Sequence, residues 1–176
     1  MDFEKTNKLN DNIVFWLASY FNTNDIQIRE MLDSQLATSF LMIWPIMENK
    51  VFGGFFKSIK ISDFVDNHYL RYEEFVTENG VKHFYNRYKD KNKLRNLCHS
   101  DRFCKNSVKL IIEKDYNDLS NKEKLTLMLF VVYRFRNNIF HGNKGIKAWR
   151  NYTTEINFCI NFMMKVIDVY NSNINV

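Results

Sequence analysis

Residues that form tight turns are nearly absent from this chain, and their scarcity constrains its fold more than any other feature. The 176 residues include one proline and five glycines. A hairpin-rich sheet needs such residues at short intervals, so the sequence favours long helices joined by few breaks. Apolar residues make up 45% of the chain, enough for a substantial core. We therefore expect one all-α domain over residues 1–176, a bundle of four or more main helices with short accessory helices.

Apolar residues at helical spacing predict the main helices. The expected helices span residues 10–21, 26–44, 68–88 (interrupted near 79–80), 106–114, 125–139 and 148–170. Pro45 should end or kink the second, because proline lacks a backbone donor and clashes with the preceding turn. Ser120 and Glu123 match a capping box, which predicts the start of the most apolar helix, and Gly142 suits its end. Residues 89–105 are polar and poorly periodic, which predicts mostly loop.

Charge is distributed unevenly along the chain, whose formal net charge is +5. Residues 82–114 hold ten bases and three acids, and residues 124–154 hold six bases and no acid. Such windows suit a polyanionic partner, although lysines also solvate ordinary helix surfaces. Tyr85, Tyr88 and Phe103 lie among these bases, where aromatic rings either stack on unpaired nucleotides or belong to the core.

Compartment and membrane association are also constrained by the sequence. No apolar run is long enough to cross a bilayer, and the first residues lack the basic and apolar regions of a signal peptide. Three cysteines, an odd number, are typical of a reducing compartment in which they act as packing residues. We expect a cytoplasmic protein without membrane association.

The residues 136–142 read Arg-Asn-Asn-Ile-Phe-His-Gly, and they carry most of the functional information. They place a guanidinium, a carboxamide and an imidazole within about two helical turns. Arg136 can hold a phosphate in two hydrogen bonds without losing its charge, while His141 can move a proton near neutral pH. On a helix Asn137 and His141 share a face, and the long side chain of Arg136 can reach over it. A histidine near a helix C-terminus is favoured in its protonated form.

This motif resembles the signature of the HEPN superfamily, small helical domains found in toxins, abortive-infection systems and CRISPR-associated nucleases. The likeness is greatest to the abortive-infection and Apea-like branches, and it covers residues 125–145 with the all-helical layout in support. It implies a HEPN-like bundle and a metal-independent endoribonuclease that requires no cofactor. In such enzymes the ribose 2′-hydroxyl attacks the neighbouring phosphorus and leaves a 2′,3′-cyclic phosphate.

The resemblance also implies roles for individual residues. His141 would transfer a proton and contact the phosphate, Arg136 would stabilise charge on the pentavalent phosphorus, and Asn137 would orient the histidine or bond the phosphate. One motif supplies one histidine, so a homodimer with a composite cleft is expected. The partners implied are single-stranded RNA or tRNA and an antitoxin or defence-system protein. The expected RNA-binding residues are Arg134, Lys144, Lys147 and Arg150.

Several alternatives remain open at the level of sequence. A non-catalytic HEPN-like module that binds RNA or protein as a sensor would use the same residues, and so would a structural interaction domain. Arginine and histidine in a last helical turn also stabilise a helix without any catalysis. Asn143 stands where toxins paired with nucleotidyltransferase antitoxins often carry a modified tyrosine, so neutralisation by that route is doubtful.

Two rival sites are disfavoured. The group Cys98, His99, Cys104 and His83 has no standard zinc-ligand spacing, so no metal is expected. Residues 95–99, Arg-Asn-Leu-Cys-His, imitate the motif but are one residue short and lie in the expected loop, so we interpret them as a decoy.

Overall fold

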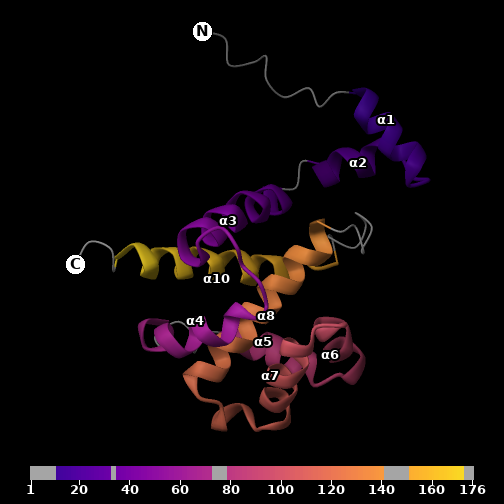
Figure 1. Cartoon of the computed structure of the whole chain (residues 1–176). Coiled ribbons are helices and arrows are strands. Elements are labelled where there is room, and N and C mark those ends of the chain that lie inside the picture. The colour runs from indigo at the N-terminus through magenta and orange to yellow at the C-terminus, as the bar shows by residue number, and fades with distance from the viewer. Residues whose placement is uncertain (1–10, 33–34, 73–78, 141–150, 173–176) are drawn as a thin grey trace.

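The structure is a computed structural model that describes residues 11–32, 35–72, 79–140 and 151–172 (Figure 1). All the regular elements within these ranges are helices, which confirms the expected all-α class. In chain order they are α1 (Asp11–Tyr20), α2 (Asp25–Leu32), α3 (Gln35–Phe52), α4 (Lys60–His68), η2 (Tyr69–Tyr72), α5 (Asn79–Tyr88), α6 (Lys91–Cys98), α7 (Arg102–Glu113), η3 (Tyr116–Asp118), α8 (Asn121–Phe140) and α10 (Thr153–Ser172). No helix in these ranges meets the length and apolarity required to span a membrane.

Helix α8 is the centre of the bundle, as its apolar sequence predicts. It packs against α4, α5, α6, α7, η2 and α10. Its start matches the predicted capping box: Glu123 accepts the Ser120 backbone N–H at 3.0 Å, and the Ser120 hydroxyl accepts the Glu123 N–H at 3.3 Å. The buried side chains that follow cover every side of the helix. They are Leu125, Leu127, Met128, Leu129, Phe130, Val131 and Val132.

Helices α3 and α10 lie along each other on one side of α8 (Figure 1). Pro45 is predicted to end or kink the helix, and it does not end it, because α3 continues through Pro45 to Phe52. Pro45 and Leu41, whose carbonyl loses its helical partner, both lie on the exposed side, where water can hydrate that carbonyl. Trp44 and Met47 flank the proline on the buried side, and their burial favours the continued helix.

The prediction that residues 89–105 are mostly loop is also wrong. They form all of α6 and the first turn of α7. Asp90 caps α6 by accepting the N–H groups of Asn92 and Lys93, and the Lys93 bond lowers the pKa of Asp90. Asp101 caps α7 in the same way. The two aspartates begin short helices whose lengths, 8 and 12 residues, leave little periodicity to detect.

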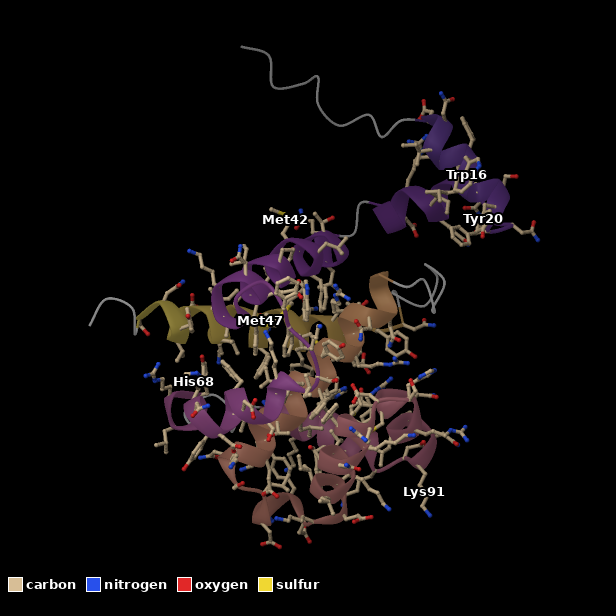
Figure 2. All side chains as sticks on the ribbon, in the orientation of Figure 1. Trp16, Tyr20, Met42, Met47, His68 and Lys91 are labelled. Atoms are coloured by element: carbon tan, nitrogen blue, oxygen red, sulfur yellow. The ribbon has the colours of Figure 1, made fainter. Side chains whose placement is uncertain are left out.

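The N-terminal helices α1 and α2 build a small cluster of their own from Val14, Ala18 and Ile28, separate from the main core. Trp16 and Tyr20 project from α1 and are largely exposed (Figure 2). The residues 26–44, for which a single helix was expected, contribute to two helices, α2 and α3.

The three aromatic residues that lie among the bases differ in burial. Tyr85 and Tyr88 are buried core residues, whereas Phe103 is exposed on α7.

Replacing Asp101 by alanine should lower the free energy of unfolding by about 1 kcal/mol, because the carboxylate accepts two N–H groups that begin α7. Those bonds run from Phe103 at 2.9 Å and Cys104 at 3.0 Å. Urea denaturation measures the change. The control Asn106→Ala, on the exposed side of α7, should stay within about 0.5 kcal/mol of the parent. Equal effects of the two substitutions would contradict the capping role.

Candidate functional site

The C-terminal part of α8 carries the described half of the motif. Arg134, Arg136, Asn137 and Asn138 are all half-buried there. His141, Lys144, Lys147 and Arg150, which the sequence assigned to catalysis and RNA contact, lie outside the described residues. The site is therefore built from the residues of α8 and from those packed around it.

Arg136 is held against the α3 side of α8. Its Nη1 donates to Asn137 Oδ1 at 3.1 Å, so its head does reach the asparagine as the sequence suggested. Its guanidinium carbon also lies 5.5 Å from the ring centroid of the buried Trp44. A cation over an indole face is stabilised by the ring quadrupole, which fixes the position of this arginine.

The opposite side of α8 forms the shared wall of two pockets. One, of about 400 Å³, includes Asn137 and the α6–α7 turn; the other, of about 450 Å³, includes Asn138 and faces α5 and α6. Arg134 and His99 line both. Residues 134, 137 and 138 are spaced i, i+3, i+4 and so share one helical face, whereas Arg136 is rotated about 200° from Arg134. The structure thus brings Arg134 together with Asn137 and Asn138. Arg136 lies on another side of α8 and reaches this group through its hydrogen bond to Asn137.

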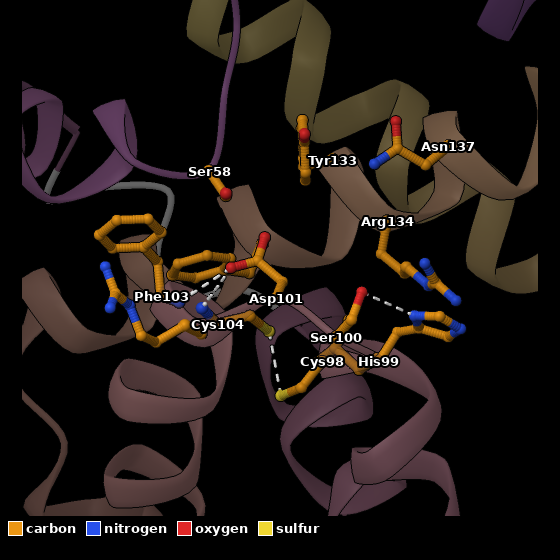
Figure 3. A pocket seen from close by; sticks show the side chains of 13 residues that line it. Ser58, Cys98, His99, Ser100, Asp101, Phe103, Cys104, Tyr133, Arg134 and Asn137 are labelled. Atoms are coloured by element: carbon orange, nitrogen blue, oxygen red, sulfur yellow. Dashed lines mark hydrogen bonds between the residues drawn. The ribbon is translucent and has the colours of Figure 1, made fainter.

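His99 reaches this wall from the turn between α6 and α7. Figure 3 shows its imidazole beside the guanidinium of Arg134. The backbone of His99 has φ 45° and ψ −123°, and the Asp101 N–H donates to the Cys98 carbonyl at 2.8 Å. These values match the first central position of a type II′ turn, which glycine normally occupies. A histidine therefore stands at a strained position, with its ring near Ser100 Oγ at 3.1 Å.

Arg134 carries a buried hydrogen-bond donor that no described residue satisfies. Its Nε atom is buried and has no hydrogen-bond partner within the described ranges. A buried donor without a partner costs about 1–3 kcal/mol. No carboxylate lines the larger pocket, and the one that lines the smaller, Asp101, accepts the two N–H groups that begin α7.

Two buried cysteines form the floor of the smaller pocket. Cys104 Sγ donates to Cys98 Sγ at 3.0 Å (Figure 3), and both are free thiols. This hydrogen bond lowers the pKa of the Cys98 thiol, while it and burial raise the pKa of Cys104. The positive charge of Arg134 favours the thiolate of either cysteine, as a smaller contribution.

An ion pair between α5 and α10 supports the far side of the larger pocket. Arg87 Nη1 lies 2.7 Å from Oε1 of Glu155, a buried carboxylate, and His83 Nε2 lies 3.5 Å from the same oxygen. The Arg87 guanidinium also covers the Tyr152 ring at 5.2 Å. Burial raises the pKa of the neighbouring Tyr88 hydroxyl well above its usual value. The charge of Arg87 is thus largely balanced by Glu155.

Sequence reasoning missed His99 as a residue of this site, and it missed Lys93, which lines the larger pocket. It set aside residues 95–99 because a loop was expected there. Asp90 and Asp101 were the available signal, since an aspartate before each helix predicts a cap and therefore a tight turn between α6 and α7. Across the described ranges, no group of three or more histidines, cysteines, aspartates or glutamates could hold a metal ion.

No protein-family model matches this chain, and neither does any curated protein or solved structure.

Replacing His99 by glycine should raise the free energy of unfolding by about 1 kcal/mol. Relief of the strained backbone is worth about 1–3 kcal/mol, and the greater entropy of glycine in the unfolded chain offsets about 0.4–1 kcal/mol of it. Thermal and urea unfolding measure the difference. His99→Ala is the matched control: it also removes the imidazole but keeps the Cβ that causes strain. If His99→Ala raised the free energy of unfolding as much as His99→Gly does, the backbone strain at this position would be absent.

Replacing Glu155 by alanine should lower the free energy of unfolding by about 3 kcal/mol, because Arg87 would remain half-buried without its counter-charge. The control Glu113→Ala removes an exposed carboxylate paired with Lys109 on α7 and should cost less than about 1 kcal/mol. Urea denaturation of both variants tests the contrast, and a Glu155 effect as small as that of Glu113 would contradict it.

Proposed function

We propose that this chain is a metal-independent endoribonuclease whose RNA-facing surface is the C-terminal part of α8. The supporting observation is the pair of adjoining pockets lined by Arg134 and His99, whose one carboxylate, Asp101, caps α7. The smaller pocket also includes Asn137, whose Oδ1 accepts a hydrogen bond from Arg136. A surface that offers guanidinium, amide and imidazole donors suits a phosphodiester backbone. The excess of basic residues in 82–114 and 124–154 adds a long-range attraction for a polyanion.

The proposed chemistry follows the HEPN resemblance of residues 136–142. The 2′-hydroxyl of the substrate attacks the adjacent phosphorus, the 5′-oxygen leaves with a proton from His141, and a 2′,3′-cyclic phosphate results. Arg136 stabilises the extra negative charge of the pentavalent phosphorus. Its hydrogen bond to Asn137 and its contact with Trp44 support this role by holding the guanidinium in one place.

The remaining parts of the proposal concern assembly and context. Two chains would pair so that two copies of the motif supply both an acid and a base to one cleft. Lys144, Lys147 and Arg150 would contact flanking phosphates. Single-stranded RNA or tRNA in the cytoplasm would be the substrate, in a toxin or antiviral defence system with an antitoxin or defence partner.

A second candidate is a non-catalytic module that binds RNA or a partner protein as a sensor. The contact between Arg136 and Trp44 favours it, because a guanidinium that lies over a buried indole ring and donates to a neighbouring amide already stabilises the fold. Binding of RNA without product formation, weakened by salt, distinguishes this candidate from the nuclease.

Purified protein should cleave single-stranded RNA in the presence of EDTA, and Arg136→Ala and His141→Ala should each lower the rate at least about 100-fold, the usual effect of losing a transition-state donor. Gel analysis of labelled RNA measures the rate and identifies the cyclic phosphate. Arg95→Ala, an exposed arginine on α6, is the control and should cleave normally. Unchanged circular dichroism verifies folding. Full activity in both test variants would reject the proposed mechanism.

A further inference from the structure

The sharpest unexplained feature of the described residues is a set of basic side chains that meet without an acid. Arg134 from α8, His99 from the α6–α7 turn and Lys93 from α6 line the same pocket of about 450 Å³. None of the residues that line it is an aspartate or a glutamate. Arg87 also lines it, but Glu155 at 2.7 Å balances that charge. Three donors that are positively charged or able to become so therefore face one space.

Two of these residues have local structure that lowers the stability of the fold. Arg134 keeps a buried Nε without a hydrogen-bond partner in the described part of the chain. His99 occupies a backbone conformation that favours glycine, with φ 45°. Each feature opposes stability by itself, and charge-assisted hydrogen bonds from the guanidinium of Arg134 to an anionic ligand would offset that cost. Strain at a side chain that lines a pocket is typical of a binding site.

The chemistry of the wall indicates which anion fits. A guanidinium donates two parallel hydrogen bonds to a phosphate, while an imidazole and an ammonium donate to its remaining oxygens. Arg134 comes from α8, whereas Lys93 and His99 come from α6 and its C-terminal cap, so donors from two elements line the pocket, as a tetrahedral anion with several acceptor oxygens requires. Asn96 and Asn138 add amide donors at the rim, and Phe135 and Tyr152 supply apolar area beside it.

We propose that Arg134, His99 and Lys93 form a binding site for one phosphate group of a nucleotide, either free or within an RNA strand. This site is separate from the Arg136 and His141 chemistry, and it binds phosphate whether or not the protein cleaves RNA. Arg134 is the principal ligand because its guanidinium lies on the wall shared by both pockets. His99 positions the phosphate from the opposite element.

The test is a binding titration with three probes at constant ionic strength and in EDTA. The probes are inorganic phosphate, adenosine 5′-monophosphate and a short 2′-O-methyl RNA oligomer, which lacks the hydroxyl needed for cleavage. Calorimetry measures the two small ligands, and fluorescence anisotropy measures the labelled oligomer. Arg134→Gln should weaken binding about tenfold, the usual value of one charge-assisted contact. It should also reduce the salt dependence of oligomer binding by about one unit of slope.

Matched variants distinguish binding at a specific site from attraction by the net charge of the protein. Arg95→Gln removes the same charge from an exposed position on α6 that lines neither pocket, and it should bind as the parent does. His99→Gln and Lys93→Gln should each weaken binding, and they carry the test if Arg134→Gln does not fold. His99→Gly should be more stable than the parent and yet bind phosphate more weakly, which a purely structural histidine cannot explain.

The probes also distinguish the sources of the phosphate. Binding of the monophosphate but not the oligomer, lost in Arg134→Gln, assigns the site to a free nucleotide. Binding of the oligomer but not the small ligands, with the same loss, assigns it to an RNA backbone. The proposal is overturned if no probe binds, or if Arg95→Gln weakens binding as much as Arg134→Gln does. Loss of RNA cleavage in Arg136→Ala with phosphate binding intact would separate this site from the proposed nuclease.

Discussion

The burial of α8 on all of its sides is the constraint on which the rest of the structure depends. Seven of its residues between 125 and 132 are withdrawn from solvent, and six other elements pack against it. A helix that is packed on all sides cannot rotate about its axis without disrupting the core, because protein interiors are close-packed. The orientation of its apolar part therefore fixes where the polar residues after Tyr133 point. The packing of the core therefore determines the geometry of these side chains.

Two arginines only two positions apart on α8 have different environments for this reason. Arg136 faces α3, where the ring of Trp44 and the amide of Asn137 hold it. Arg134 faces α6, where it lines two pockets together with His99. Substitutions at the two positions are therefore expected to have separate consequences, one for the proposed nuclease activity and one for the proposed phosphate site.

The pockets also depend on two features far from α8 in sequence. Asp90 and Asp101 fix the starts of α6 and α7 and so define the turn that carries His99. The buried pair of Arg87 and Glu155 joins α5 to α10 and supports Tyr152 at the pocket wall. Removing one partner of a buried pair costs more than removing an exposed one, because the remaining charge stays desolvated. This part of the pocket wall is thus supported by electrostatics as well as by apolar packing.

The sequence by itself determined the all-α class, the capping box at Ser120 and the central place of α8, because local propensity and an apolar run act over a few residues. It could not determine that α3 continues through Pro45, since that outcome depends on the burial of Trp44 and Met47. It also identified Arg134 and Asn137 as polar residues of interest but not their neighbours. Only the tertiary structure decided that His99 lies beside Arg134, because the packing of α6 against α8 joins residues 35 positions apart, and no local pattern encodes such a contact.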